Sequence, residues 1–429
     1  MYKSNNSDLT ESLVEEPQLL LDFNANRTQE KIVSKNTYNV LSLFSGCGGF
    51  DLGMNGNFDF RGRHYEKNKF QVVFANDIDA TAASVYNSNK SFFGNHSLVK
   101  EDVKKIVLED LPDFDFLIAG FPCQPFSNAG LRKGVNDDRG TLFEECEKIL
   151  KLALKKKRAP LGFIFENVKG IMSSKMSNGT TIPDEIVKRT EKLGYKTCYK
   201  LLRTCDYGVP TNRHRLIIVG IRKDIGYFDF TLLDQVIAEY NLPNAKYNPY
   251  ELFLGSVLSD IPENAPQKND FWKYSPGGQY MVDKIGPCAD GKEVLRKFKN
   301  KVPIQKISET ITTGRSWKNM SPSDMSERFL KIWENPAKYR APNFYRRFAL
   351  GEINGTITAS AQPENCGITH PFENRRFTLR EIARIQSFPD EFAFPYKSIS
   401  EAYKVIGNAV PPIFAWVLAQ ALTKHIDNA

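Results

Sequence analysis

Five short apolar segments, each bounded by polar or turn-forming residues, recur along the first half of the chain. Amphipathic stretches separate them, and their sequences are YNVLSLF (38–44), QVVFAND (71–77), FDFLIAGF (114–121), LGFIFENV (161–168) and RLIIVGIR (215–222). Strands that are apolar almost throughout are typical of a parallel sheet that helices cover on both faces. The pattern therefore predicts a doubly wound α/β domain with a mostly parallel sheet.

The alternation of strand and helix signals is interrupted in the second half of the chain. Residues 225–373 are instead rich in Pro, Gly, Thr, Lys and aromatic residues. A helix is then expected at TLREIARIQSF, where Thr378 and Glu381 form a capping-box pattern, and a last helix at 412–424. The predicted organisation is an N-terminal extension (1–36), a larger domain (37–224 and 374–429) and a smaller inserted domain (225–373).

Composition narrows the class of protein. The chain is 41% hydrophobic and 25% charged, as in ordinary soluble proteins, and no uncharged run approaches the roughly 20 apolar residues of a membrane span. The N-terminal sequence MYKSNNSDLTESLVEEPQ lacks the basic and apolar regions of an export signal. The seven cysteines show no CxxC pair or His spacing of a zinc site. We expect a cytoplasmic protein with reduced cysteines, no metal and no membrane partner.

The net charge of +8 is concentrated in one segment. Residues 301–350 hold ten Lys/Arg and four Asp/Glu, a local charge of +6. A basic cluster of this kind indicates a polyanionic partner for the inserted domain.

Side chains suited to chemistry lie where the apolar segments end or begin. The first segment runs into a Gly-rich turn (44–49), and the second ends at Asp77. Because the carboxyl ends of parallel strands meet at the edge where such sheets bind ligands, these features predict a nucleoside-containing cofactor. On their own they allow a nicotinamide or flavin cofactor as readily as S-adenosylmethionine.

The third segment leads to a cysteine between two prolines, Pro122-Cys123-Gln124-Pro125. Most cysteines are small buried apolar residues. Prolines stiffen the chain, so this thiol is expected to be presented on a rigid loop at the edge of the sheet. Glu166 at the end of the fourth segment is expected at the same edge, and Arg213 and Arg215 flank the start of the fifth segment. Taken singly, a surface carboxylate and salt-bridged arginines are the alternatives.

These features occur within a longer ordered series of motifs. The series is FSGCGG (44–49), GFPCQPFS (120–127), DDRGTLF (137–143), ENV (166–168), RHR (213–215), TLREIARIQSFPDEF (378–392) and YKVIGNAVPP (403–412). In order and spacing it resembles the DNA cytosine-C5 methyltransferase family, in the form of a bacterial type II restriction-modification methylase. The resemblance implies transfer of a methyl group from S-adenosylmethionine to C5 of cytosine in double-stranded DNA, with 225–373 as the target-recognition domain.

The resemblance also implies roles for individual residues. Cys123 attacks C6 of a cytosine flipped out of the duplex, Glu166 binds N3 and the exocyclic amine, and Arg213 and Arg215 contact O2 and the developing charge. The base that removes the C5 proton is not identified. For Asp102 an ordinary helix cap is the alternative to a cofactor contact. The implied cofactor residues are Phe44, Gly46, Gly48, Asp77, Ile78, Asp102, Val103, Pro122, Leu142, Asn408 and Val410.

Two segments are candidates for contact with DNA. The loop after Cys123, with Ser127, Arg132 and Lys133, is expected to close over the duplex. In the inserted domain, Arg315 and Lys318 are the candidates for DNA contacts. The family's last motif returns to the sheet, so residues 401–429 should pack beside the Gly-rich turn. One departure is Thr211, where the family usually has Gln. A monomer is expected, sharing its DNA site with a cognate restriction endonuclease.

Three other classes remain to be distinguished. A tRNA-modifying relative predicts a short target segment, whereas about 150 residues separate RHR from TLREIAR here. A non-catalytic DNA-binding homologue should lack Cys123 or Glu166, and both are present. An oxidoreductase with a dinucleotide-binding fold explains the Gly-rich turn but neither the PCQPFS motif nor the basic inserted domain.

Overall fold

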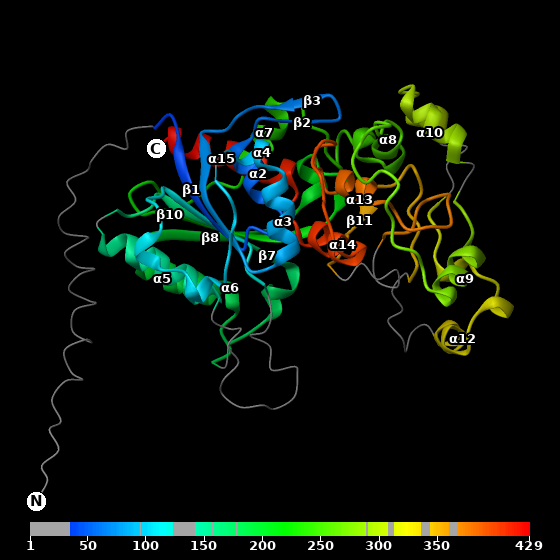
Figure 1. Cartoon of the computed structure of the whole chain (residues 1–429), viewed down its shortest axis with the longest axis horizontal. Helices are drawn as coiled ribbons and strands as arrows, with labels where there is room; N and C mark the ends of the chain where they lie inside the picture. Colours follow the sequence, from blue (N-terminus) through cyan, green and yellow to red (C-terminus); the bar gives the residue numbers. More distant parts are fainter. Residues whose placement is uncertain are drawn as a thin grey trace, which may run out of the picture.

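A seven-stranded sheet forms the centre of the larger part of the molecule (Figure 1). Its strand order is β5-β4-β1-β6-β7-β10-β8. The strands are β1 (Tyr38–Leu43), β4 (Phe70–Asp77), β5 (Val99–Lys100), β6 (Phe116–Ala119), β7 (Gly162–Val168), β8 (Tyr195–Arg203) and β10 (His214–Arg222). The computed structural model describes residues 35–94, 96–122, 142–156, 158–176, 178–288, 291–307, 313–335, 344–359 and 367–429.

Neighbouring strands from β5 to β7 are parallel, whereas β10 is antiparallel to both β7 and β8. The prediction of a mostly parallel sheet is confirmed, and all five predicted strands are present. Strand β8 was not predicted, because its sequence YKTCYKLLR mixes polar and apolar residues. It lies at the sheet's edge, where polar side chains reach solvent.

Helices cover both faces of the sheet, as expected for a doubly wound domain. Successive residues of a strand point to opposite faces, so Val40 joins the core on one side of β1 and Leu41 the core on the other. The first core contains side chains of α2 (Gly49–Asn55), α3 (Ala80–Ser88), α13 (Leu379–Ile385) and α15 (Pro412–Asp427). The second contains side chains of α5 (Leu142–Lys155) and α6 (Ile182–Lys192).

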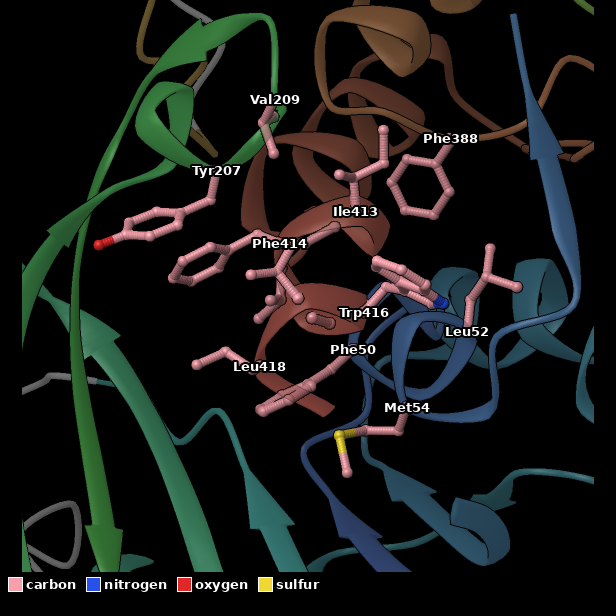
Figure 2. Packing of buried hydrophobic residues seen from close by; sticks show 14 of the residues in the cluster. Phe50, Leu52, Met54, Tyr207, Val209, Phe388, Ile413, Phe414, Trp416 and Leu418 are labelled. Carbon is pink, nitrogen blue, oxygen red and sulfur yellow. The ribbon is translucent and has the colours of Figure 1, made fainter. Parts of the chain in front are cut away.

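The C-terminal helix α15 packs directly on α2, the helix that follows the Gly-rich turn (Figure 2). Phe50, Leu52 and Met54 of α2 share one buried cluster with Ile413 and Trp416 of α15. The two backbones approach closely because glycines face the contact. A Cβ atom on Gly49 would lie 2.2 Å from the carbonyl oxygen of Val410, and one on Gly53 would lie 2.3 Å from the Cβ of Ala415. The expected return of the last segment to the Gly-rich turn is confirmed.

The segment Ile399–Asp427, which contains α14 (Ile399–Asn408) and α15, is long and apolar enough to cross a membrane by length and composition. However, 89% of its most apolar window is buried inside the protein. This burial is that of a core helix, in agreement with the packing of α15 against α2.

The smaller part of the molecule has a core of its own. Its buried residues all come from positions 281–345 and are Met281, Val282, Ile285, Trp317, Met320, Met325, Ile332 and Tyr345. A buried arginine ties this part together: the Arg347 guanidinium donates to the carbonyl oxygens of His370 (2.7 Å) and Val282 (2.9 Å). Helices α9 (Pro276–Ile285) and α12 (Glu327–Glu334) contribute to this core, whereas the buried residues of α8 (Leu254–Leu258), α10 (Gly291–Lys299) and α11 (Ile304–Ile307) belong to the first core.

The start of the predicted inserted domain packs with the larger part. Helix α7 (Leu232–Glu239) contacts α15, and α8 contacts α13. Leu233 and Val236 of α7 and Val257 of α8 belong to the first core. The separate core therefore begins well after residue 225.

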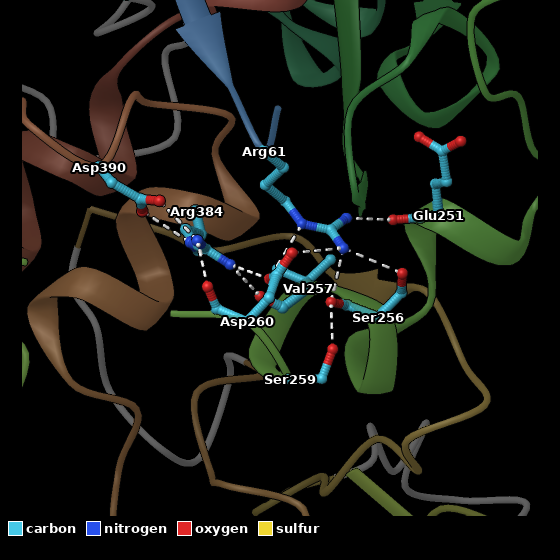
Figure 3. A network of polar contacts seen from close by, with 8 residues as sticks. All are labelled: Arg61, Glu251, Ser256, Val257, Ser259, Asp260, Arg384 and Asp390. Atoms are coloured by element: carbon cyan, nitrogen blue, oxygen red, sulfur yellow. Dashed lines mark hydrogen bonds and ion pairs between the residues drawn. The ribbon is translucent and has the colours of Figure 1, made fainter. Parts of the chain in front are cut away.

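An ion-pair network fastens α8 to the larger part (Figure 3). Arg61, in the turn between β2 (Phe58–Phe60) and β3 (Arg63–Tyr65), donates to the Ser256 carbonyl oxygen (2.7 Å) and pairs with Asp260 (3.3 Å). The buried Arg384 of α13 pairs with both Asp260 and Asp390. Separating α8 from the larger part would leave a buried charge without its partner, which costs free energy. The network therefore stabilises the packing of α8 against the larger part.

The close approach of α2 and α15 leads to a stability prediction. Gly53→Ala should lower the free energy of unfolding by about 1–3 kcal/mol, because the added methyl overlaps the Ala415 side chain. The matched control is Gly277→Ala in α9, where a Cβ would meet no atom within 4 Å; it should leave the free energy of unfolding unchanged within about 1 kcal/mol. Urea unfolding of the full chain measures both. Equal stability of the two variants would contradict the proposed contact.

Candidate active site

A cleft of about 580 Å³ lies at the carboxyl edge of the parallel strands. This volume is within the range of about 300–1,000 Å³ found for cofactor and small-molecule sites. Its lining comes from the Gly-rich turn, the ends of β4, β6 and β7, the start of β10, and α14 with the residues after it. The lining residues are Ser42, Leu43, Phe44, Ser45, Gly46, Phe50, Asp77, Ile78, Asp79, Ala82, Gly120, Phe121, Pro122, Glu166, Asn167, Val168, Arg213, Arg215, Lys404, Val405, Asn408, Ala409 and Val410.

Strand register brings four of these residues into one row across the sheet. Leu43 of β1 pairs with Asn76 of β4 and with Ala119 of β6, and Ala119 pairs with Phe165 of β7. The residues that follow these four paired positions are Asp77 at the end of β4, Phe44 after β1, Gly120 after β6 and Glu166 on β7. Residues far apart in the sequence thus meet at one edge.

The Gly-rich turn is held to the tip of β4 by the carboxylate of Asp77. The Gly46 backbone N–H donates to Oδ2 of Asp77 (2.8 Å), and the Asp79 N–H donates to Oδ1 (2.8 Å). Phe44 and Gly46 both have φ of 55°, a left-handed conformation that favours glycine. Burial raises the pKa of Asp77 above its usual range. The turn leaves open space at Gly46, where a Cβ would meet no atom within 4 Å.

Two apolar residues, Phe44 and Ile78, line the cleft together with Asp77. Ile78 is 68% exposed although it is a large apolar residue. The Phe44 ring packs edge-on against Phe121, with 6.5 Å between the ring centroids. Exposed apolar surface beside a hydrogen-bonding carboxylate suits a flat aromatic base joined to a ribose.

Seven of the eleven expected cofactor residues line the cleft: Phe44, Gly46, Asp77, Ile78, Pro122, Asn408 and Val410. The other four lie elsewhere, at positions explained by packing or capping. Gly48 has φ of 87°, and a Cβ there would lie 2.4 Å from the Phe93 ring. Asp102 caps the 3-10 helix Val103–Lys105 by accepting from the Lys104 N–H (3.0 Å). Val103 is buried in the second core, and Leu142 packs against it.

Glu166 and Arg215 form a buried ion pair in the cleft. Arg215 Nε lies 2.5 Å from Glu166 Oε1, and each side chain is 9% exposed. The pair forms because β10 runs antiparallel to β7, so that the start of β10 reaches the edge where β7 ends. Burial raises the pKa of Glu166, and the positive charge of Arg215 offsets part of that shift. A carboxyl group in this setting keeps its proton to a higher pH than a free glutamate does.

The chain that leads to Cys123 passes beside Glu166. A Cβ on Gly120 would lie 3.5 Å from Glu166 Oε2. Asn167 Nδ2 donates to the Phe121 carbonyl oxygen (3.0 Å) and so ties the start of this loop to β7. Asn167 was not singled out from the sequence, although its place beside Glu166 in the ENV motif was a usable signal. Cys123 itself, with Ser127, Arg132 and Lys133, lies outside the described residues.

Arg213 lines the cleft, but its guanidinium is engaged by the protein. Nη1 donates to the carbonyl oxygens of Ile357 (2.8 Å) and Gly407 (2.7 Å), and the residue is 1% exposed. These contacts join the start of β10 to the last motif and to the segment after the smaller part. The geometry favours a positioning role for Arg213, and the substrate contact expected from the sequence stays a prediction.

The expected DNA-contacting residues of the smaller part lie together. The Arg315 backbone pairs with that of Arg347 (2.9 and 2.7 Å), and Lys318 is exposed on the short helix Trp317–Asn319. Between them Trp317 is 1% exposed and anchors the segment in the core of the smaller part.

Thr211, the departure from the family pattern, has a structural contact. Its hydroxyl donates to the Gly355 carbonyl oxygen (2.9 Å) where β9 (Thr211–Asn212) pairs with β11 (Asn354–Gly355).

Several residues of the cleft were not expected from the sequence. Lys404 of α14 lines it and pairs with Asp79 (2.9 Å), the residue that caps α3. Ser42 and Ser45 also line it. Among the residues that the structure describes, no cluster of three or more His, Cys, Asp or Glu side chains is arranged to hold a metal ion. The described cysteines Cys47, Cys146, Cys198, Cys205 and Cys288 form no disulfide with one another.

A mostly parallel sheet with one antiparallel strand and a nucleoside-sized cleft at its carboxyl edge is the methyltransferase fold. The model of the C-5 cytosine-specific DNA methylase family matches residues 38–424. The chain belongs to this family and is a DNA cytosine-5 methyltransferase.

Named relatives align with most of the chain. Type II methyltransferase M.FnuDI of Fusobacterium nucleatum is 31% identical over 391 residues, which are 91% of this chain and 95% of the relative. Type II methyltransferase M.NgoPII of Neisseria gonorrhoeae is 30% identical over 405 residues, 92% of this chain and 99% of the relative. A crystal structure from E. coli, described as a prophage-encoded DNA modification methyltransferase, has a TM-score of 0.54 at 23% identity and covers 91% of this chain and 100% of its own. This last likeness concerns the fold.

The raised pKa of Glu166 predicts how its contribution to stability depends on pH. A carboxyl group whose pKa is raised by folding stabilises the folded state most below its unfolded pKa, and the contribution is lost as pH rises through the folded pKa. The free energy of unfolding of the wild type minus that of Glu166→Gln should therefore fall as pH rises from about 4.5. Urea unfolding at a series of pH values tests this. If the stability difference between wild type and Glu166→Gln instead grew with pH, the pKa of Glu166 would be lowered by folding. The attraction to Arg215 would then outweigh the effect of burial.

Proposed function

We propose that this methyltransferase transfers the methyl group of S-adenosylmethionine to C5 of a cytosine flipped out of double-stranded DNA, with Cys123 as the nucleophile. The observation that carries the proposal is the row of residues at the sheet edge. It places the nucleoside-sized cleft, the Glu166–Arg215 pair and the chain leading to Cys123 side by side.

The residues of the cleft fit S-adenosylmethionine. Asp77 presents a carboxylate to ribose hydroxyls, and Phe44 and Ile78 offer apolar surfaces for the adenine ring. The open space at Gly46 admits a ligand close to the backbone. Asn408 and Val410 line the opposite wall. When bound, the cofactor supplies an electrophilic methyl group.

Glu166 and Arg215 are suited to activate a cytosine ring. C5 of cytosine is a poor nucleophile, and addition of a thiolate at C6 pushes electron density onto the ring. Glu166, with its raised pKa, would hold a proton at N3 and accept from the exocyclic amine. Arg215 would stabilise negative charge developing at O2. Arg213 would hold the start of β10 in position through its carbonyl contacts.

Cys123 would form the bond to C6 and later leave by elimination, when the C5 proton is removed. Its thiolate form is favoured by a guanidinium nearby, and Arg215 is the candidate. Asn167 and Gly120 support this role, because they bring the loop that carries Cys123 past Glu166.

The substrate is proposed to be duplex DNA. A base within a duplex is stacked and must be extruded to reach the cleft. The excess positive charge of residues 301–350 suits phosphate contacts by the smaller part, with Arg315 and Lys318 as candidates. The loop with Ser127, Arg132 and Lys133 would close over the DNA. The smaller part serves in this proposal as the target-recognition domain.

The biological role is proposed to be protection of host DNA within a type II restriction-modification system. The relatives M.FnuDI and M.NgoPII both carry the name type II methyltransferase. A monomer acting in the cytoplasm would modify the recognition site and so block cleavage by a cognate endonuclease, which need not bind the methyltransferase.

Replacing the nucleophile tests the mechanism. Cys123→Ser should lower turnover by at least about 10³-fold, because a serine hydroxyl is a far weaker nucleophile at neutral pH. Cofactor affinity should change less than about twofold, since the cleft is untouched. The matched control is Cys198→Ser on β8, outside the cleft lining, which should keep full activity. The readout is labelled methyl transfer to duplex DNA and to tRNA in parallel. Full activity of Cys123→Ser would exclude the mechanism, and transfer to tRNA alone would exclude the substrate.

Expression in a host that lacks the methyltransferase tests the biological role. Bisulfite sequencing should show C5 methylation at one short recurring sequence. DNA from these cells should resist an endonuclease that recognises this sequence, whereas DNA from cells expressing Cys123→Ser should be cut. Complete digestion of the methylated DNA would contradict the protective role.

A further inference from the structure

A fully buried carboxyl group lies directly behind the floor of the cleft and has no part in the mechanism above. Asp51 of α2 is 0% exposed. Its Oδ1 accepts from the Ser42 hydroxyl (2.6 Å), and its Oδ2 accepts from the Tyr86 hydroxyl (2.9 Å). Ser42 itself lines the cleft. This carboxyl group is therefore hydrogen-bonded directly to a residue of the cleft lining.

The surrounding hydrogen bonds are ordered toward Asp51. When the carboxyl group is ionised, Ser42 and Tyr86 both donate to it, so each hydroxyl oxygen is left free to accept from a further neighbour. Ser45 Oγ lies 2.8 Å from Ser42 Oγ, and His96 Nε2 lies 2.9 Å from the Tyr86 hydroxyl. Two hydroxyl donors thus solvate the carboxylate in place of water, one on each of its oxygens.

This charge has hydroxyl partners but no positive partner. Among the residues that the structure describes, no Lys, Arg or His side chain forms an ion pair with Asp51. The ionisable groups that face it are Asp77, Cys47 and Tyr86, with His96 behind Tyr86. Burial raises the pKa of Asp51 to about 7. A nearby positive charge would favour the ionised form.

Other charged groups of the cleft are already engaged. Glu166 pairs with Arg215, Asp79 pairs with Lys404, and Arg213 is bonded by carbonyl oxygens. Asp77 accepts from the backbone N–H groups of Gly46 and Asp79. Asp51 therefore contributes an uncompensated negative potential to the floor beside Ser42. Such a potential acts more strongly in the low-dielectric interior of a protein than in bulk water.

We propose that Asp51 is a specificity-determining residue that favours the positively charged form of the cofactor over its neutral product. The inference rests on the proposed cofactor. S-adenosylmethionine carries a permanent positive charge on sulfur, and the product S-adenosylhomocysteine is a neutral thioether there. The two ligands share adenine, ribose and the amino acid group. A buried negative charge can distinguish the two ligands through its electrostatic attraction to the sulfonium, without direct contact with either ligand.

The test compares the affinities of both ligands for the full chain, measured by titration calorimetry. At about pH 8.5, where Asp51 is ionised, Asp51→Asn should weaken S-adenosylmethionine about tenfold and S-adenosylhomocysteine less than about twofold. The amide keeps the shape of the side chain, and the hydroxyl groups of Ser42 and Tyr86 can rotate to satisfy it. The matched control is Tyr86→Phe, which removes one hydrogen bond and keeps the charge; it should weaken both ligands by the same factor.

Equal weakening of the two ligands by Asp51→Asn would overturn the proposal and leave Asp51 a structural residue. If the variant does not fold, the wild type still tests the idea. Its preference for the charged ligand should fall as pH is lowered from about 8.5 to about 6, since Asp51 becomes protonated, and a constant preference would overturn the proposal. Failure of the wild type to bind either ligand would instead refute the proposed cofactor.

Discussion

The in-register ends of four parallel strands determine the rest of the site. Asp77, Phe44, Gly120 and Glu166 are separated by up to 122 positions in the sequence, yet they lie in one row because β4, β1, β6 and β7 pair in register up to the residue before each of them. A shift of one residue in any pair would turn that strand's side chain to the opposite face of the sheet. Backbone hydrogen bonding thus positions both the cofactor cleft and the catalytic pair.

Two further constraints complete the cleft. Strand β10 runs antiparallel to its neighbours, and this direction brings Arg215 to Glu166. Glycines at 49 and 53 let α15 approach α2, and the residues just before α15 then form the second wall of the cleft. The first and last motifs of the chain are adjacent for this reason, and the smaller part is attached between them.

Much of this arrangement could be predicted from the sequence. The five strands, the capping box of Thr378 and Glu381, and the return of the last helix to the Gly-rich turn are all confirmed. Each depends on local patterns or on dense motifs. The predictions were less complete where a role depends on distant partners. Arg213, for example, is bonded to carbonyl oxygens 144 and 194 residues away.

By itself, the sequence determined the class of fold and the family, because strand patterning and ordered motifs are properties of neighbouring residues. Only the tertiary structure decided the direction of β10, the separate core of the smaller part, and the isolation of Asp51 from positive charge. These features depend on which surfaces meet after the chain has folded. Hydrogen-bond partners and buried charges are set by that contact, and no spacing along the chain specifies them.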